Sequence, residues 1–354
     1  MMHLQQSLRR EKILGGYYLP DSILESSLAE KTIDVLDGSL RLYDEMVDAG
    51  IPEEDARYIL PLYVYTFIQT TTNARELTHL DSMNGGGSVP PIVRYGVDRM
   101  VEEAAKIAPL LMKRREYNYE KLGWWPSAQL YSMSNQMLSN IVSLYRNPKE
   151  PMFVSYMPQP EEIANAIKNR DEAELANLKH IHNGSHLEGI LVMLSLVSLH
   201  QEIRQRTLNQ SVEPIFTAVA RRRIFTPPNI GNSAFKDRYV AQAMAMLDLY
   251  PALSAETITM GDVIGVVPHA LMVYDLLHVN GFNSLHYLGK RKCTKTQYES
   301  RVMADKVGEI IKARSPALAH VIAPQGDLYG RCPEKDPCGL CRKASNVSAK
   351  KEGQ

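Results

Sequence analysis

Hydrophobic residues recur at helical spacing along most of the chain. Apolar positions three to four residues apart predict helices over residues 24–49, 93–112, 171–180, 235–249 and 304–313. The first helix ends at Gly50, and Pro52 with the acids after it begins another, because proline suits the first helical turn and carboxylates suit its positive end. Residues 63–72 and 187–203 are strongly apolar, and their pattern does not decide between strand and helix.

The same pattern occurs twice along the chain. Identical residues lie 207 positions apart at Pro20/Pro227, Tyr43/Tyr250, Pro61/Pro268, Asn73/Asn280, His79/His286, Arg94/Arg301 and Pro109/Pro316. Upstream of these the separation becomes 204, where residues 4–7 resemble residues 208–211, and an insertion of three residues would account for the change. Repeats at a fixed separation indicate duplicated structural units.

The repeat sets the expected domain organisation. A predicted strand at 152–157 begins the second unit, and the first unit lacks a counterpart of this N-terminal segment. The chain is then a fragment, or its first unit is a half-unit. We predict a partial first unit, a connector, a second unit and a Cys-rich tail over residues 1–112, 113–151, 152–325 and 326–354.

Composition excludes several classes of protein. Forty basic residues balance forty acidic ones, whereas a dedicated nucleic-acid binder is usually clearly basic. Three arginines at 221–223 and the lysines of the tail could form only a local patch. No apolar run is long enough for a membrane span, and the N-terminus lacks the apolar stretch of a secretory signal. Four cysteines do not form a disulfide framework, so we predict a cytoplasmic, reduced protein.

Three polar clusters could carry chemistry. They are HNGSHLEG (182–189) with HQEIRQRTLNQS (200–211), ARYILPLYVYTFIQTTTNARELTHL (56–80) and FNSLHYLGKRKCTKTQYESR (282–301). Arg204 and Arg206 could hold two anionic groups, because each guanidinium offers a fork of donors. Arg75 and His79 are four residues apart and would share a helix face. The alternative for each cluster is an ordinary charged turn or solvated helix end.

The order and spacing of these segments resemble the flavin-dependent thymidylate synthases, the ThyX family. HNGSHLEG resembles the family's His-x-Gly-Ser-type segment, and HQEIRQRTLNQS resembles its Arg-His-Arg segment. ARYILP (56–61) and NARELTHL (73–80) match its Ala-Arg-x-x-Leu-Pro and Asn-x-Arg-x-Leu segments. Arg291 before Gln297-Tyr298-Glu299 matches an arginine six residues before Gln-x-Glu. The resemblance covers residues 1–112 and 152–320.

The resemblance implies an α/β (α+β) protein in which helices pack on a small antiparallel sheet, here duplicated in tandem with a Cys-rich tail. It implies a homotetramer whose active sites form at subunit contacts, with no nucleic-acid or membrane partner expected. The implied reaction methylates dUMP to dTMP, with methylenetetrahydrofolate as carbon donor, NADPH as reductant and FAD as cofactor. Fixed guanidinium groups suit a phosphate monoester, and the redox work falls to the flavin.

The resemblance also assigns roles residue by residue. The catalytic residues would be Arg204, Arg206 and Arg291. The substrate-binding residues would be Arg57, Gln201, Ser211 and Arg291. The cofactor-binding residues would be His182, Arg204, Gln205, Arg206, Asn73, Arg75, His79, Asn280 and His286.

The sequence departs from the family pattern inside these segments. Arg-His-Arg is replaced by Arg204-Gln205-Arg206, and four residues rather than seven separate Arg206 from Ser211. Val212-Glu213-Pro214 stands where the family has a closing Arg-Tyr, and Glu188-Gly189 stands where it has Glu-His. These changes affect the expected flavin and nucleotide pockets.

The losses in the two units are complementary. Unit one keeps Arg57 and Arg75 where unit two has Ile264 and Phe282, whereas unit two keeps Arg291 where unit one has Asn84. If sites form between units, each composite site needs each group only once. Two hypotheses follow: a thymidylate synthase with composite sites, and a catalytically degenerate relative that binds nucleotide or flavin or serves as a scaffold.

The tail suggests a metal. Cys332, Cys338 and Cys341 form C-x5-C-x2-C, and thiolates at this spacing can occupy three corners of a zinc tetrahedron. Cys293 or His320 could be the fourth ligand. The alternatives are free thiols in a disordered tail and an iron–sulfur cluster.

Overall fold

The computed structural model describes most of the chain. The described residues are 2–5, 11–13, 15–84, 90–112, 149–154, 188–203, 209–256, 258–279, 281–314, 322–328, 330–334 and 337–341, with isolated positions elsewhere. None of the helices in these ranges combines the length and apolar character needed to cross a membrane.

The first half of the chain contains two strands and a series of helices. Its elements are β1 (Met2–Gln5), α1 (Asp21–Leu24), α2 (Ala29–Asp48), α3 (Glu53–Ala56), the 3₁₀ helix η1 (Arg57–Ile59), β2 (Ile68–Thr71), α4 (Ala74–Asn84) and α5 (Pro91–Ile107). The predicted helix end at Gly50 is confirmed, since α2 ends at Asp48 and Gly50 has the positive φ of 88° that favours glycine. Pro52 stands directly before α3, as predicted.

The second half begins with β3 (Met152–Val154), β4 (Glu188–Ser195) and α9 (Leu196–Ile203). The elements that follow are β5 (Asn209–Val212), α10 (Ile215–Arg221), α11 (Pro228–Gly231), α12 (Lys236–Ala255), α13 (Met260–Val263), η3 (Ile264–Val266), β6 (Met272–Val279), α14 (Gly281–Arg291), α15 (Tyr298–Arg314) and α16 (Gln325–Leu328). Residues 187–203, for which the sequence pattern does not decide between strand and helix, contain a strand followed by a helix. The predicted helix at 171–180 lies outside the described residues.

The repeat found in the sequence is also a repeat of structure. Seven elements recur with both bounds shifted by 207 residues: β1/β5, α1/α11, α2/α12, α3/α13, η1/η3, α4/α14 and α5/α15. The predicted change to 204 is wrong, because Met2 pairs with Thr71 as Asn209 pairs with His278, which keeps the separation at 207. The register of the backbone hydrogen bonds between paired strands fixes which residues of the two units are equivalent, whereas a short match of polar residues does not.

The two units meet across a pseudo-twofold axis near Pro61 and Pro268. These two residues form an antiparallel bridge although they are equivalent positions of the repeat. Leu62 N donates to Val267 O at 2.9 Å, and the equivalent bond joins His269 N to Leu60 O at 3.0 Å. The reciprocity of these backbone bonds shows that the units pack as a twofold-related pair within one chain.

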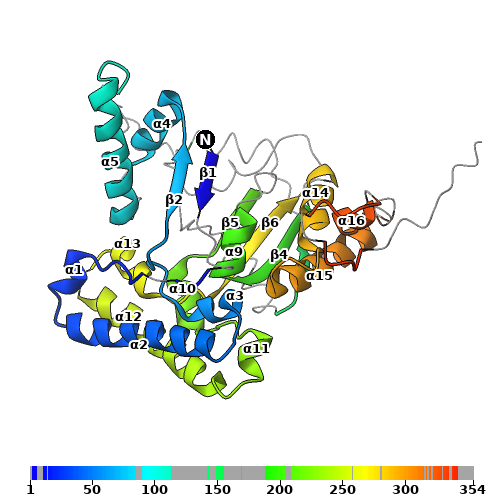
Figure 1. Ribbon diagram of the computed structural model, residues 1–354, viewed down its shortest axis with the longest axis horizontal. Helices are drawn as coiled ribbons and strands as arrows, with labels where there is room; N and C mark the ends of the chain where they lie inside the picture. Colours follow the sequence, from blue (N-terminus) through cyan, green and yellow to red (C-terminus); the bar gives the residue numbers. More distant parts are fainter. Residues whose placement is uncertain are drawn as a thin grey trace, which may run out of the picture.

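Helices α2 and α12, equivalent elements of the two units, lie side by side (Figure 1). Leu36 and Tyr43 of α2 share one buried apolar cluster with their counterparts, Ala243 and Tyr250 of α12. A core that draws on both units stabilises them as a single body, since burying each large apolar side chain contributes about 2 kcal/mol.

The larger sheet has the order β3-β4-β6-β5, and its neighbouring strands are all antiparallel. Ile190, Val192 and Leu194 of β4 pack beneath residues of α14 and α15, which cover one face of the sheet (Figure 1). In the other unit β1 and β2 form a two-stranded sheet, and α4 and α5 pack on each other. The predicted fold class, helices on small antiparallel sheets in a tandem duplication, is confirmed.

Candidate functional site

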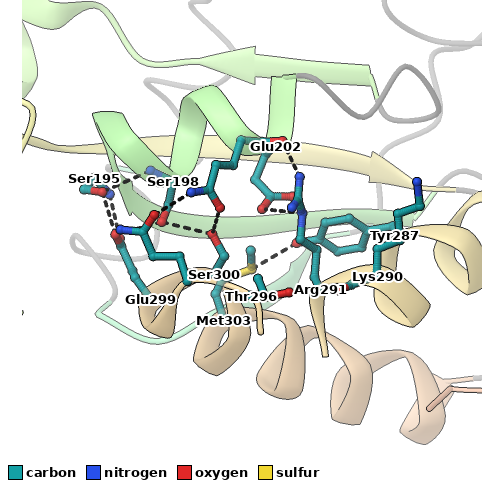
Figure 2. A network of polar contacts seen from close by, with 12 residues as sticks. Ser195, Ser198, Glu202, Tyr287, Lys290, Arg291, Thr296, Glu299, Ser300 and Met303 are labelled. Carbon is teal, nitrogen blue, oxygen red and sulfur yellow. Dashed lines mark hydrogen bonds and ion pairs between the residues drawn. The ribbon is translucent and has the colours of Figure 1, made fainter. Parts of the chain in front are cut away.

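A buried polar cluster lies where the two units meet, and we call it the junction cluster. Its residues are Arg57 and Tyr58 of η1, Ser195 at the end of β4, Ser198, Gln201 and Glu202 of α9, Arg291 of α14, and Gln297, Glu299 and Ser300 at the start of α15. Figure 2 shows side chains from α9, α14 and α15 pointing toward one another. Strand, helix and 3₁₀ ends converge here, so side chains from distant parts of the sequence reach one site.

Glu299 is the most heavily bonded carboxylate of the cluster. Its Oε2 accepts from Ser195 Oγ at 2.5 Å, Ser198 Oγ at 2.8 Å and the Tyr58 hydroxyl at 3.1 Å. Its Oε1 accepts from the backbone N–H of Ser195 at 2.7 Å. Burial raises the pKa of Glu299, and the hydrogen bonds from both serines and Tyr58 oppose that rise. This carboxylate therefore ties η1 of unit one to β4, α9 and α15 of unit two.

Gln297 connects the same elements through its amide. Its Oε1 accepts from the Arg57 guanidinium and from Gln201 Nε2. Its Nε2 donates to the Tyr58 hydroxyl and, at 3.4 Å, to the carbonyl of Glu54. Gln297 is thus the direct link between the arginine of unit one and the glutamine of α9.

Arg291 approaches Gln201 from the end of α14. Its Nη2 donates to the Gln201 carbonyl at 2.5 Å, and its Nε lies 3.4 Å from Oε1 of Glu202. Ser300 Oγ donates to Gln201 Oε1 at 3.0 Å. Within the described part of the chain, the Arg291 Nε–H makes no hydrogen bond of normal geometry. The Arg291 Nε–H therefore faces Glu202 in a buried ion pair.

The electrostatics of the cluster favour a positive site. Burial raises the pKa of Glu202 to about 7, an effect that Arg291 and the Tyr287 hydroxyl oppose. Burial, Arg57 and His200 lower the pKa of His269 to about 3, so this histidine is neutral at physiological pH. With Glu202 partly neutral, the two guanidinium groups carry a charge that the nearby acids compensate only in part.

The structure brings together three of the residues that the resemblance assigns. Arg57, Gln201 and Arg291 all belong to the junction cluster, and Arg57 is 8% exposed. Asn73, Arg75, His79 and His286 are instead exposed on other surfaces. Asn73 Oδ1 accepts from Glu76 N at 2.9 Å and so caps α4, which packs against α5. These four residues lie outside the cluster.

Several assigned residues fall outside the description. They are His182, Arg204, Gln205, Arg206, Asn280 and the side chain of Ser211. The backbone of Ser211 lies in β5 opposite Leu276. The roles assigned to all these residues stay predictions.

The sequence interpretation missed part of the cluster. Tyr58, Ser195, Ser198, Glu202, Glu299 and Ser300 had no assigned role. Ser195, Ser198 and Glu202 interrupt a strongly apolar run, and hydroxyl or carboxyl groups within such a run are a signal for a buried polar site. Their partners could not be identified, because Tyr58 and Glu299 are 241 residues apart.

The pseudo-symmetric counterpart of the cluster has lost its polar groups. At the 207-residue separation, Ile264, Gly265, Pro90 and Ile92 stand where the cluster has Arg57, Tyr58, Gln297 and Glu299. A Cβ on Gly265 would lie 2.2 Å from the Tyr63 ring, so this ring occupies the space that a tyrosine at position 265, the equivalent of Tyr58, would need. Each unit has lost the arginine that the other keeps, and the two retained arginines, Arg57 and Arg291, lie in a single cluster.

The cysteines of the tail are free thiols, and all are partly exposed. Within the described ranges no three His, Cys, Asp or Glu side chains form a group that could hold a metal ion as placed. The predicted metal ligands Cys332, Cys338 and Cys341 lie in loops after α16.

Comparisons with known proteins point to one family. The family model described as thymidylate synthase complementing protein, Thy1, matches residues 2–110 and 154–317. The flavin-dependent thymidylate synthase of Saccharolobus solfataricus is 34% identical over 115 residues, which cover 31% of this chain and 44% of that protein. The Geobacter sulfurreducens enzyme of the same name is 27% identical over 174 residues, covering 48% of this chain and 72% of that one.

The coverage of the relatives is partial. The chain spans less than half the length of the first curated relatives it matches, including the Pyrococcus furiosus flavin-dependent thymidylate synthase, of which it covers 45% at 34% identity. A solved structure of ThyX from Helicobacter pylori, complexed with FAD and dUMP, is 15% identical, with a TM-score of 0.34 over 49% of this chain and 99% of that one.

The two matched stretches contain both copies of the structural repeat, and together they make up well over half of the chain. The resemblance seen in the motifs is thereby confirmed, and the chain belongs to the thymidylate synthase complementing protein family, the ThyX family.

Proposed function

We propose that this chain is a flavin-dependent thymidylate synthase that methylates dUMP to dTMP, with methylenetetrahydrofolate as carbon donor, NADPH as reductant and FAD as cofactor. One observation carries the proposal. Arg57 of unit one and Arg291 of unit two, two arginines that the family resemblance assigns to the nucleotide, are linked through Gln201 and Gln297 in one buried cluster.

The junction cluster suits a phosphorylated nucleotide. Charge-assisted hydrogen bonds from guanidinium groups to phosphate contribute more than neutral ones, and burial strengthens them. Gln297 holds Arg57 and Glu202 holds Arg291 in place before the ligand arrives, which reduces the entropy lost on binding.

The residues proposed for FAD fit its chemistry in the part that is described. Arg75, His79 and His286 are exposed polar side chains, and a diphosphate with flavin carbonyls accepts hydrogen bonds from such groups. When bound, FAD supplies the hydride for reduction of the transferred carbon. The chain's own residues bind and orient the nucleotide, and His269 stays neutral beside Arg57.

Self-association is part of the proposal. Tyr65, Phe67 and Ile68, at and just before β2, are 55%, 80% and 58% exposed. A run of large exposed apolar groups marks an interaction surface, and a second copy of the chain would cover it. The folate and NADPH are proposed as further partners.

A second candidate is a relative that binds nucleotide without catalysis. The replacement of the central histidine of Arg-His-Arg by Gln205 favours it, because it changes a group at the expected flavin pocket.

The test is a pair of measurements on the purified full chain. The visible spectrum with added FAD, before and after dUMP, reports flavin binding, and tritium release from 5-tritiated dUMP reports turnover. Arg291→Ala should abolish release, whereas Arg41→Ala, which removes an exposed arginine, should leave it unchanged. Flavin binding without release would favour the second candidate, and failure to retain flavin in excess FAD would overturn the synthase proposal.

A further inference from the structure

All four cysteines of the chain come together beside the end of α14. Cys293 follows α14 by two residues, and Thr294 Oγ1 lies 3.0 Å from the Sγ of Cys338. Cys341 interacts electrostatically with Cys332, Cys338 and Cys293. Cys293 is 39 to 48 positions from the other three in the sequence, so the fold, not sequence proximity, brings it beside them.

A glycine makes this approach feasible. A Cβ on Gly326 of α16 would lie 2.3 Å from the Sγ of Cys341 and 3.4 Å from the Cα of Cys332. Any larger residue would therefore push these cysteines away from α16. Gly326 is buried, so the thiols pack directly on the backbone of this short helix.

The Cys338–Cys341 segment has the shape of a metal-binding turn. The two cysteines are separated by two residues, and Gly339 has a φ of 74°, which glycine adopts without strain. The backbone N–H of Leu340 donates to the Cys338 sulfur, which also contacts the Thr294 hydroxyl. Hydrogen bonds to a ligand sulfur of this kind stabilise a thiolate and fix its orientation.

We propose that Cys293, Cys332, Cys338 and Cys341 bind one zinc ion through four thiolates. Each thiol gives its proton to solvent as its sulfur bonds to the metal, and no electron is transferred. In the described part of the chain, no three of these groups stand at metal-binding separation yet. Residues 330–334 and 337–341 belong to no helix or strand, and binding the metal would require the three thiols they carry to move toward Cys293.

The zinc site would be structural, and it would affect the junction cluster indirectly, through the position of Arg291. A zinc ion with four protein thiolates has no open coordination position. Cys293 lies two residues after Arg291, so the metal would fix the C-terminal end of α14 and with it the arginine that contacts Gln201. This role is independent of the proposed synthase activity, because it concerns only metal content and the stability of the tail.

The test is the metal content of the full chain, purified without a polyhistidine tag under reducing conditions and measured by inductively coupled plasma mass spectrometry. One zinc per chain is expected, with no stoichiometric iron. Cys293→Ser and Cys338→Ser should each lose it. His320→Ala and Asp327→Asn are the matched controls and should keep it, since a histidine or carboxylate ligand would fail there instead.

Because a cysteine variant could lose metal simply by failing to fold, a second measurement uses the wild-type chain loaded with cobalt. The wild-type chain loaded with Co²⁺ should show thiolate-to-metal charge transfer in the near ultraviolet and the intense visible bands of tetrahedral cobalt. Wild-type protein that takes up neither zinc nor cobalt while all four thiols are reduced would overturn the proposal. Stoichiometric iron, disulfides among the four cysteines, or zinc retained by Cys293→Ser but lost by His320→Ala would overturn it as well.

Discussion

The guanidinium of Arg57 donates to Oε1 of Gln297, which lies 240 residues further along the chain. The bond joins η1 of one repeat unit to the start of α15 of the other. At the equivalent positions across the pseudo-twofold axis, Ile264 and Pro90 can make no such bond. The two units are therefore equivalent in backbone and different in chemistry, and a single polar cluster remains where the symmetry alone would give two.

Replacing Arg57 tests whether the junction cluster binds the nucleotide. Arg57→Ala removes a charged donor, and such a donor contributes about 1.5–3 kcal/mol to a bond with an anion, or roughly 10–100-fold in affinity. We predict a loss of dUMP affinity of that size by isothermal titration calorimetry. Arg41→Ala removes an exposed arginine of unit one and should bind dUMP as the wild-type chain does. Equal affinities for both variants would contradict the assignment.

Replacing Glu299 tests the role of the cluster in stability. Glu299→Leu leaves the Tyr58 hydroxyl, two serine hydroxyls and the Ser195 N–H without their acceptor. Stranded buried donors cost about 1–3 kcal/mol each, so we predict a loss of at least about 3 kcal/mol in the free energy of unfolding by urea denaturation. Glu309→Leu changes an exposed residue of the same helix and should stay within about 0.5 kcal/mol. A small effect at Glu299 would refute its anchoring role.

Glu202 predicts an unusual pH dependence of stability. Its folded pKa is raised to about 7, whereas an unfolded glutamate titrates at about 4.3. The folded state therefore binds more protons between these values, and the contribution of Glu202 to stability falls as the pH rises from about 4.3 to about 7. Glu202→Gln should remove this fall.

The measurement is urea unfolding of the wild type and Glu202→Gln at several pH values across that window. The stability of the wild type relative to the variant should decrease with rising pH. A difference that stays constant, or grows with pH, would show that Glu202 is ionised throughout in the folded protein.

Gly265 tests the packing that closes the counterpart of the cluster. A Cβ there would lie 2.2 Å from the Tyr63 ring, so Gly265→Ala should destabilise the chain by about 1–3 kcal/mol. Gly96 of α5 has no atom within 4 Å of a Cβ built on it, and Gly96→Ala should instead stabilise the helix by up to about 1 kcal/mol. Thermal unfolding of both variants provides the check, and equal shifts would contradict the packing.

The repeat and most helices could be predicted from sequence because both depend on local pattern. Tyr43 and Tyr250 mark equivalent positions of α2 and α12, and Gly50 ends α2 as expected. The separation of 204 was wrong because a four-residue polar match carries little information, whereas the ladder through Met2 and Thr71 fixes the register.

The junction cluster was only partly predictable. Arg57 and Arg291 carry recognisable motifs, but Tyr58 and Ser195 acquire their role from Glu299, which lies 241 and 104 residues away. No sequence pattern encodes such a contact without the fold. Asn73 has a local role that the motif did not indicate, since its side chain caps α4; its proposed cofactor contact stays a prediction. The domain boundaries at 112, 151 and 325 stay predictions.

The most direct test of the account is a dUMP titration of the FAD-loaded full chain, followed by the flavin absorption spectrum. A single retained junction cluster predicts a spectral change that saturates at one dUMP per chain, weakened in Arg57→Ala and unchanged in Arg41→Ala. Saturation at two dUMP per chain, or no response to dUMP in a protein that retains flavin, would contradict it.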